Sequence, residues 1–424
     1  MARVIIAGGG WAGCGAAAAA AKKRVEVVVL ERTDMLLGTG LVGGIMRNNG
    51  RFTATEEAIA LGCGDLFRLT DQETRHKNIE FPGHKHASLY DVATMEPTVK
   101  KYLQDQGVEL HFQARVTDVE MAGKTIKQVK TANGDVFHAD VFIDTTGTAG
   151  PMNNCTRHGN GCACCILRCP SFGGRVSLTA KAGVEEMIGV KKDGSVGAMS
   201  GSCKLLKESL APAIVEELNR SGVAIIPIPA NLAASEEKLA MKACQQYALK
   251  EFAENIILLD TGHAKLMSPY FPLELLRKVP GMQNARYEDP YAGGLGNSMR
   301  YMGMAPRNDA LQVEGVDNLF CAGEKAGLLV GHTEAIVTGS LAGYNAACQA
   351  RGEELLILPD SLVIGDAITF VRTEMQTEEG KTKKYTFSGS VLFERMKQKG
   401  FYSTNLDEIR GRVANAGLMN VMLG

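Results

Sequence analysis

Short apolar runs alternate with helix-forming stretches through the first 150 residues of the chain. Residues 3–7 and 25–30 are aliphatic runs typical of buried strands, and six consecutive alanines lie between them at residues 16–21. Residues 92–106 repeat apolar side chains at three- and four-residue steps, as an amphipathic helix does. Residues 139–147 are a further apolar run that ends in a Thr-Thr-Gly turn. This alternation predicts an α/β fold built on a buried sheet.

Shorter strands interrupt that alternation between residues 107 and 138. Residues 107–112 and 114–119 have strand-forming composition. Residues 127–130 and 136–138 flank Asn133-Gly134, a strong signal for a tight hairpin turn. We therefore expect one strand followed by a three-stranded meander.

The pattern changes after residue 150 and returns to strand, turn and helix near residue 316. Residues 171–270 mix short segments, including expected strands at 175–179 and 256–259. Residues 316–321 are aliphatic, and a long helix is expected from residue 331 to about 350. The expected organisation is a Rossmann-like domain in two parts (1–150 and 281–355), a cysteine-rich loop with an inserted α+β cap (151–280), and a small C-terminal accessory or oligomer-contact element (356–424).

The glycines after the first strand have the spacing of a dinucleotide-binding turn. Gly8, Gly10 and Gly13 fit G-x-G-x-x-G, in which glycine permits the tight turn, the approach of a pyrophosphate and close helix packing. Glu31 ends the second strand eighteen residues after Gly13, close to the spacing of about 20 expected of a carboxylate that binds ribose hydroxyls. The prediction is a dinucleotide site, and the alternative is a βαβ unit with an empty turn. Further expected contacts are Trp11, Ala12 and Arg32.

Two further glycine-rich stretches favour a flavin. Residues 37–44 include Gly38, Gly43 and Gly44, which would let the backbone approach a flat, bulky group, although an ordinary flexible loop has the same composition. Residues 316–334 resemble the second glycine turn of flavoproteins. In those proteins the turn places a helix N-terminus at the pyrimidine edge of the isoalloxazine, where the helix dipole stabilises a reduced ring. Two such anchors favour FAD over NAD. The contacts expected in the second turn are Gly323, Glu324, Gly331, His332 and Thr333.

Three residues of the second turn are candidates for chemistry. His332 and Glu324 are expected near the flavin edge, and Lys325 could stabilise a reduced flavin anion. Each is equally compatible with a structural cap or a surface charge.

The order of elements up to residue 147 resembles the FAD-binding half of glutathione-reductase-like flavoproteins. In that family a strand segment like residues 114–116 contacts adenine and an Asp-x-x-Gly turn closes the site, which implies roles for Val116, Asp144, Thr146 and Gly147. Residues 280–284, 317–324 and 331–347 resemble the glucose-inhibited-division-protein-A superfamily. That superfamily includes tRNA-uridine-modifying flavoproteins and a folate- and FAD-dependent tRNA methyltransferase. The resemblance covers about half of the chain.

A cysteine-rich stretch follows the first part of the domain. Five of the eleven cysteines fall within fifteen residues. Cys162, Cys165 and Cys169 form C-x2-C-x3-C-P, which partly matches the pattern of bacterial ferredoxins, and Cys155 would supply a fourth thiolate. The prediction is a [4Fe–4S] iron–sulfur cluster. The alternatives are structural zinc on four cysteines, a redox-active Cys162/Cys165 pair, and unligated buried cysteines.

Composition is that of a globular protein. The chain has 424 residues, of which 45% are hydrophobic and 22% charged, and its net charge of −1 argues against a broad nucleic-acid footprint. The first strand leaves no room for a signal peptide, and no apolar run reaches the roughly 18 residues that span a bilayer. We expect a cytoplasmic protein with reduced cysteines and no membrane partner. His76, His84 and His86 lack metal-ligand spacing and are expected at the surface.

Three functions are compatible with these features. The leading hypothesis is an FAD-dependent oxidoreductase whose iron–sulfur cluster receives electrons from a small-molecule or protein donor. The first alternative is an FAD- and folate-dependent tRNA-modifying enzyme with a basic patch around the cap. The second is a zinc-stapled flavin-binding protein without turnover. The residues of the expected basic patch are Lys181, Lys191, Lys192, Lys204 and Lys207.

Overall fold

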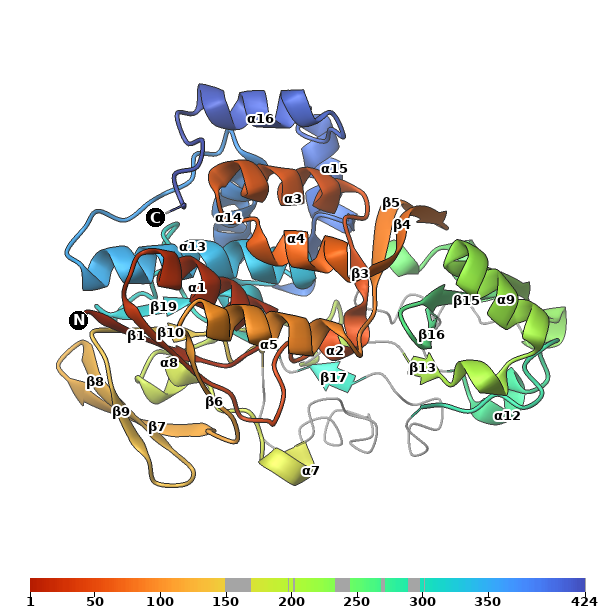
Figure 1. Cartoon of the computed structure of the whole chain (residues 1–424), viewed down its shortest axis with the longest axis horizontal. Coiled ribbons are helices and arrows are strands. Elements are labelled where there is room, and N and C mark those ends of the chain that lie inside the picture. Colours follow the sequence, from red (N-terminus) through yellow and green to blue (C-terminus); the bar gives the residue numbers. More distant parts are fainter. Residues whose placement is uncertain are drawn as a thin grey trace.

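A parallel sheet of five strands forms the centre of the protein (Figure 1). The computed structural model describes residues 1–148, 169–196, 198–200, 203–232, 245–267, 271–288, 298–300 and 302–423. The strands follow the order β19-β10-β1-β2-β6, which is the order of a Rossmann-like fold, and the predicted α/β class is confirmed. Their bounds are β1 (Arg3–Ala7), β2 (Glu26–Leu30), β6 (Glu109–His111), β10 (Val141–Asp144) and β19 (Leu319–Cys321).

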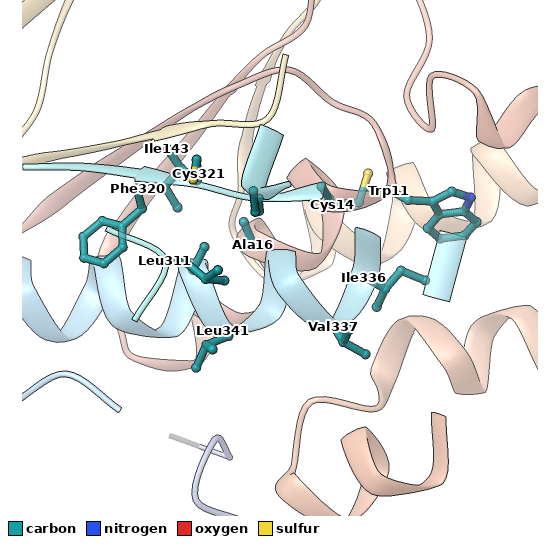
Figure 2. Packing of buried hydrophobic residues seen from close by; sticks show 14 of the residues in the cluster. Trp11, Cys14, Ala16, Ile143, Leu311, Phe320, Cys321, Ile336, Val337 and Leu341 are labelled. Atoms are coloured by element: carbon teal, nitrogen blue, oxygen red, sulfur yellow. The ribbon is translucent and has the colours of Figure 1, made fainter. Parts of the chain in front are cut away.

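Two parallel helices, α1 (Trp11–Lys22) and α13 (His332–Ala350), pack closely against each other and against this sheet (Figure 1). Their backbones nearly touch, because a Cβ added at Gly339 or Gly343 would meet the carbonyl oxygen of Ala12 or Ala16. Figure 2 shows side chains of α1 (Trp11, Cys14 and Ala16) and of α13 (Ile336, Val337 and Leu341), which belong to one hydrophobic cluster. The small residues of both helices therefore set a fixed, short distance between them.

The predicted meander forms one corner of the molecule. Its strands are β7 (Val116–Ala122), β8 (Thr125–Thr131) and β9 (Val136–His138), and the Asn133-Gly134 turn joins β8 to β9. The Asn318 side chain fastens it to the sheet, since its amide donates to the Ile126 and Asp140 carbonyls and its oxygen accepts from the Ile126 N–H. The expected helix at 92–106 is α5 (Met95–Asp105).

Residues 40–90 contain a second small sheet that the sequence patterns did not predict. Strand β3 (Ile45–Met46) pairs with β5 (His84–Tyr90), which pairs with β4 (Thr74–Phe81). The expectation that His84 lies at the surface is wrong: the residue is 2% exposed, and its ring stacks between Phe81 and Tyr247. The helices of this region are α2 (Gly40–Gly43), α3 (Gly50–Leu61) and α4 (Asp65–Gln72).

The cap contains a four-stranded antiparallel sheet with its own apolar core. Its order is β13 (Cys203–Leu205), β16 (Ala264–Leu266), β15 (Asn255–Asp260) and β14 (Val223–Pro227), so the strand expected at 256–259 is confirmed. The strand expected at 175–179 is wrong, because Ser177 caps a helical turn, α8, by accepting a hydrogen bond from the Ala180 N–H. The remaining elements are α7 (Cys169–Phe172), α8 (Leu178–Lys181), β11 (Met187–Ile188), β12 (Ala198–Ser200), α9 (Pro212–Ser221), α11 (Lys250–Glu254), α12 (Leu273–Leu276), β17 (Ser298–Arg300) and β18 (Gly303–Met304).

The C-terminal segment packs on the sheet domain as part of the same core. Helices α14 (Val363–Glu374) and α16 (Leu406–Asn415) both contact α3, and α15 (Ser390–Gln398) follows β20 (Tyr385–Thr386). The predicted domain boundaries stay a prediction. Among the helices that the structure describes, we found none with both the length and the apolarity to cross a bilayer.

Candidate cofactor site

The turn between β1 and α1 has the form that a bound phosphate needs. Gly8 has φ +108°, and a Cβ there would lie 2.5 Å from the Thr145 carbonyl oxygen. A Cβ at Gly13 would collide with the Gly8 carbonyl oxygen, so helix and strand lie as close as the motif predicts. A Cβ at Gly10, by contrast, would meet nothing within 4 Å among the described residues. Among the described residues, nothing therefore blocks the approach of a ligand to the backbone at Gly10.

Glu31 lies beside this turn at the end of β2. Its carboxylate accepts hydrogen bonds from the Gly9 N–H (2.6 Å) and the Thr33 N–H (2.7 Å), and the residue is 8% exposed. Two backbone donors hold the carboxylate in one orientation. The role of Glu31 in binding ribose stays a prediction.

The second glycine turn brings His332 against the loop at residues 37–44. The ring of His332 packs directly on Gly43, where a Cβ would overlap it. Its centroid is 6.4 Å from the ring centroids of both Trp11 and Tyr90. Tyr90 also donates to the Gly40 carbonyl (2.6 Å). Residues expected to contact the same flavin thus meet in one cluster.

The N-termini of α1 and α13 begin side by side, at Trp11 and His332. In the described part of the chain neither helix start has a side-chain cap, since Gly10 and Gly331 occupy the two N-cap positions. The positive ends of two helix dipoles therefore lie close together. This arrangement fits the two phosphates and the electron-rich ring of FAD.

A buried ion pair that sequence reasoning missed holds the start of α13. Arg51 Nε lies 3.1 Å from Glu334 Oε2, and Glu334 is fully buried. Glu334 also accepts hydrogen bonds from the Thr386 hydroxyl (2.7 Å) and the Phe387 N–H (2.8 Å). The partners are up to 283 residues apart in sequence, so no local pattern could have shown them.

The two charged residues of the short helix η4 (Gly323–Ala326) have different surroundings. Lys325 is fully buried, and its ammonium pairs with Glu186 and donates to the Ser177 hydroxyl (2.9 Å). Glu324 is half-buried and accepts a hydrogen bond from Thr148 (2.7 Å). Lys325 is thus committed to an internal ion pair, and a role for either residue in chemistry stays a prediction.

The Asp-x-x-Gly turn begins at the end of β10, and its role in closing the cofactor site stays a prediction. Asp144 is fully buried and accepts from Thr146 (hydroxyl, 2.7 Å) and from Thr179 (N–H, 2.8 Å), while Gly147 has φ +72°. Four other expected contacts are in the described part of the chain. Gly38 has φ +50°, and Gly44 lies against Thr261 of the cap. The Gly323 N–H donates to the Thr338 hydroxyl, and Val116 begins β7.

The predicted metal site lies largely outside the described residues. Cys155, Cys162 and Cys165 fall in the stretch 149–168, and Cys169 begins α7. Within the part of the chain that the structure describes, no cluster of histidine, cysteine and acidic side chains could hold a metal. Burial raises the pKa of the Cys14 and Cys321 thiols to about 12, so both behave as unreactive core residues.

Comparison with solved structures gives the same fold. The form I and form II crystal structures of Aquifex aeolicus GidA superpose with TM-scores of 0.68 and 0.65, each at 17% identity, and cover all of this chain and 76% and 74% of those chains.

Curated relatives match over a shorter stretch. The methylenetetrahydrofolate–tRNA-(uracil-5-)-methyltransferases TrmFO of Exiguobacterium sp. and Bacillus cytotoxicus are each 32% identical, over 102 and 101 residues. Each match spans 23% of this chain and only 22% of the relative.

The family model described as Glucose inhibited division protein A matches residues 3–224 and 260–354, which is most of the chain. Together with the glycine turns, Glu31 and the paired helix N-termini, this match shows that the chain belongs to the glucose inhibited division protein A family of FAD-dependent flavoproteins.

Proposed function

We propose that this protein is an FAD-dependent enzyme that modifies uridine in tRNA. The observation that carries the flavin part is the convergence of two helix N-termini, each with glycine as its N-cap, beside the glycine turns. The tRNA part is supported by family membership and by the two TrmFO methyltransferases that share a segment with the chain. When bound, FAD supplies the redox chemistry, and the protein positions it.

Each part of the site has a distinct task in this proposal. The N–H groups at the start of α1 bind the pyrophosphate, and Glu31 binds the adenosine ribose. The start of α13 at His332 and Thr333 would lie beside the flavin ring when FAD is bound, and its dipole would favour negative charge there. The His332 imidazole, packed on Gly43, holds or transfers a proton at this edge.

The RNA contact is assigned to exposed lysines of the cap segment. Lys181, Lys191 and Lys192 are exposed. Lys204 and Lys207, which were expected in the same patch, instead form ion pairs with Glu288 (2.8 Å) and Asp260 (2.5 Å). Unmodified tRNA should be retained on a filter at low salt and released as salt rises, because phosphate binding displaces counterions.

A matched pair of variants tests this assignment. The triple variant K181E/K191E/K192E should lose tRNA retention, whereas Lys397→Glu on α15 should retain it. Failure of the wild-type protein to retain tRNA at low salt would contradict the RNA substrate. Tritium or mass analysis of the tRNA after incubation with a folate one-carbon donor then distinguishes methylation from other changes.

The second candidate function is the iron–sulfur oxidoreductase, favoured by the C-x2-C-x3-C-P pattern of Cys162, Cys165 and Cys169 with Cys155 upstream. Anaerobically purified protein should then contain iron and acid-labile sulfide in equal amounts. Zinc in their place would support the zinc-stapled alternative. Flavin with neither metal would exclude both interpretations of the cysteine stretch.

A further inference from the structure

The segment Gly173-Gly174-Arg175 crosses the edge of the sheet at which the cofactor site lies. Arg32, directly after Glu31, donates from Nη1 to the Gly173 carbonyl (2.6 Å). Arg115, directly before β7, donates from Nη1 to the Gly174 carbonyl (3.3 Å). Two arginines therefore fasten this segment across the ends of the elements assigned to ribose and adenine.

Glycine is required where the segment is fastened. Gly173 has φ +76°, and a Cβ there would lie 2.8 Å from the Arg115 guanidinium. Any larger residue would push Arg115 away and loosen the segment from β7. The local sequence thus allows a close, fixed fit between this segment and the sheet domain.

The Arg175 guanidinium lies against the turn that supports the dinucleotide-binding glycines. A Cβ at Gly147 would lie 2.8 Å from Arg175 Nη1. Two residues earlier, the Thr145 hydroxyl donates to the Gly8 carbonyl (2.6 Å). Arg175 is half-buried, so its guanidinium lies near the glycine turn and is partly shielded from solvent.

The chemistry of this position suits a phosphate. The start of α1 offers N–H groups and a partial positive charge, but it contributes no formal cation to the two charges of a pyrophosphate. A guanidinium supplies a full charge and paired donors whose geometry matches phosphate oxygens. We propose that Arg175 binds the pyrophosphate of FAD and makes the protein select FAD over riboflavin, which has no phosphate.

This inference rests on the flavin part of the proposed function and is independent of the tRNA part. The test uses the full chain stripped of flavin, titrated with FAD and with riboflavin while flavin fluorescence is followed. Arg175→Gln should weaken FAD binding by roughly 10- to 100-fold, the usual range for a charge-assisted hydrogen bond. Riboflavin binding should change by less than about twofold, because it lacks the group that Arg175 contacts.

Two further variants separate binding from folding. Arg175→Lys keeps the charge and should recover part of the FAD affinity. A near-UV circular dichroism spectrum of Arg175→Gln like that of the wild type would show that its fold is intact. Arg220→Gln, on the exposed α9 helix, should leave FAD affinity unchanged. Unchanged FAD affinity in Arg175→Gln, or equal loss for FAD and riboflavin, would overturn the inference. Wild-type protein that binds no FAD would instead overturn the flavin assignment itself.

Discussion

At the scale of single residues, Glu57 is a carboxylate enclosed at a helix junction. It is fully buried on α3 and accepts hydrogen bonds from the Val363 and Ile364 N–H groups (2.9 and 2.7 Å) at the start of α14. Burial raises the pKa of Glu57 to about 7, despite those two donors. The folded protein therefore holds a proton on Glu57 over a pH range in which the unfolded chain has released it.

The sign of the resulting pH dependence follows from this raised pKa. The stabilising contribution of Glu57 is complete below its ordinary pKa, near 4.5, and is lost as pH rises to about 7. Glu57→Gln cannot titrate, so from pH 5 to 8 its free energy of unfolding should rise relative to wild type, by about 3 kcal/mol at most. Urea unfolding of both proteins at several pH values measures this. A constant difference across the range would contradict the raised pKa.

Trp11 reports on the cofactor because it is the single tryptophan of the chain. It is 3% exposed and lies between the glycine turn and the Tyr90 ring, whose centroid is 6.0 Å away. We expect its fluorescence to rise when FAD is removed and to fall when FAD is added back. A W11F variant, without the indole, is the control. An unchanged Trp11 signal on flavin release would mean that the cofactor lies elsewhere.

At the scale of elements, the α1–α13 contact leaves no room for a side chain at Gly339 or Gly343. A Cβ at Gly339 would lie 2.9 Å from the Ala12 carbonyl carbon, and the backbone of α1 can yield only by moving the whole helix. Gly339→Ala should therefore destabilise the protein by roughly 1–3 kcal/mol and weaken FAD binding. Thermal unfolding and a flavin titration measure the two effects.

Gly411 is the matched control for that change. It lies within α16, and a Cβ there would meet nothing within 4 Å among the described residues. Gly411→Ala should therefore stabilise the protein by about 0.5–1 kcal/mol, since alanine favours a helix and nothing is displaced. Equal changes in stability for Gly339→Ala and Gly411→Ala would show that the close packing of α1 and α13 does not require glycine at residue 339.

At the scale of the whole molecule, a charge cluster joins the cap to the sheet domain. Asp260, at the end of β15, is fully buried and lies 2.9 Å from His76 Nε2, 3.2 Å from Arg75 Nε and 2.5 Å from Lys207 Nζ. Burial raises the pKa of Asp260, but hydrogen bonds from Lys207 and His76 outweigh it and hold the pKa below its ordinary value. The cluster thus stabilises the joint at neutral pH and weakens only in acid.

Removing this carboxylate should loosen the joint. Asp260→Asn leaves the Lys207 and Arg75 charges without their shared partner, which should cost about 3 kcal/mol of stability. Differential scanning calorimetry measures the loss. Asp105→Asn removes one partner of the exposed Lys101–Asp105 pair and should cost less than about 1 kcal/mol. Equal effects would show that the Asp260 cluster does not hold the two parts together.

Local patterns predicted the α/β fold and its glycine turns, because each of these elements depends on residues close in sequence. The sequence patterns did not predict contacts between residues far apart in the chain. The expected strand at 175–179 fails because the Ser177 cap and the Thr179 bonds to Asp144 favour a helical turn. His84 is buried through its stacking with Tyr247 and its hydrogen bond to Asn48 (2.9 Å), partners that no periodicity shows.

The link from Glu334 to Thr386 and Phe387 has a consequence for synthesis of the protein. During synthesis the first glycine turn is complete before α13 is made. The start of α13 then lacks part of its support until residue 387 has left the exit tunnel. Tight capture of the flavin is therefore expected only after Thr386 and Phe387 have been made. Ribosome-bound chains arrested before Thr386 should hold no flavin, whereas chains arrested far enough beyond residue 387 to expose it should hold it.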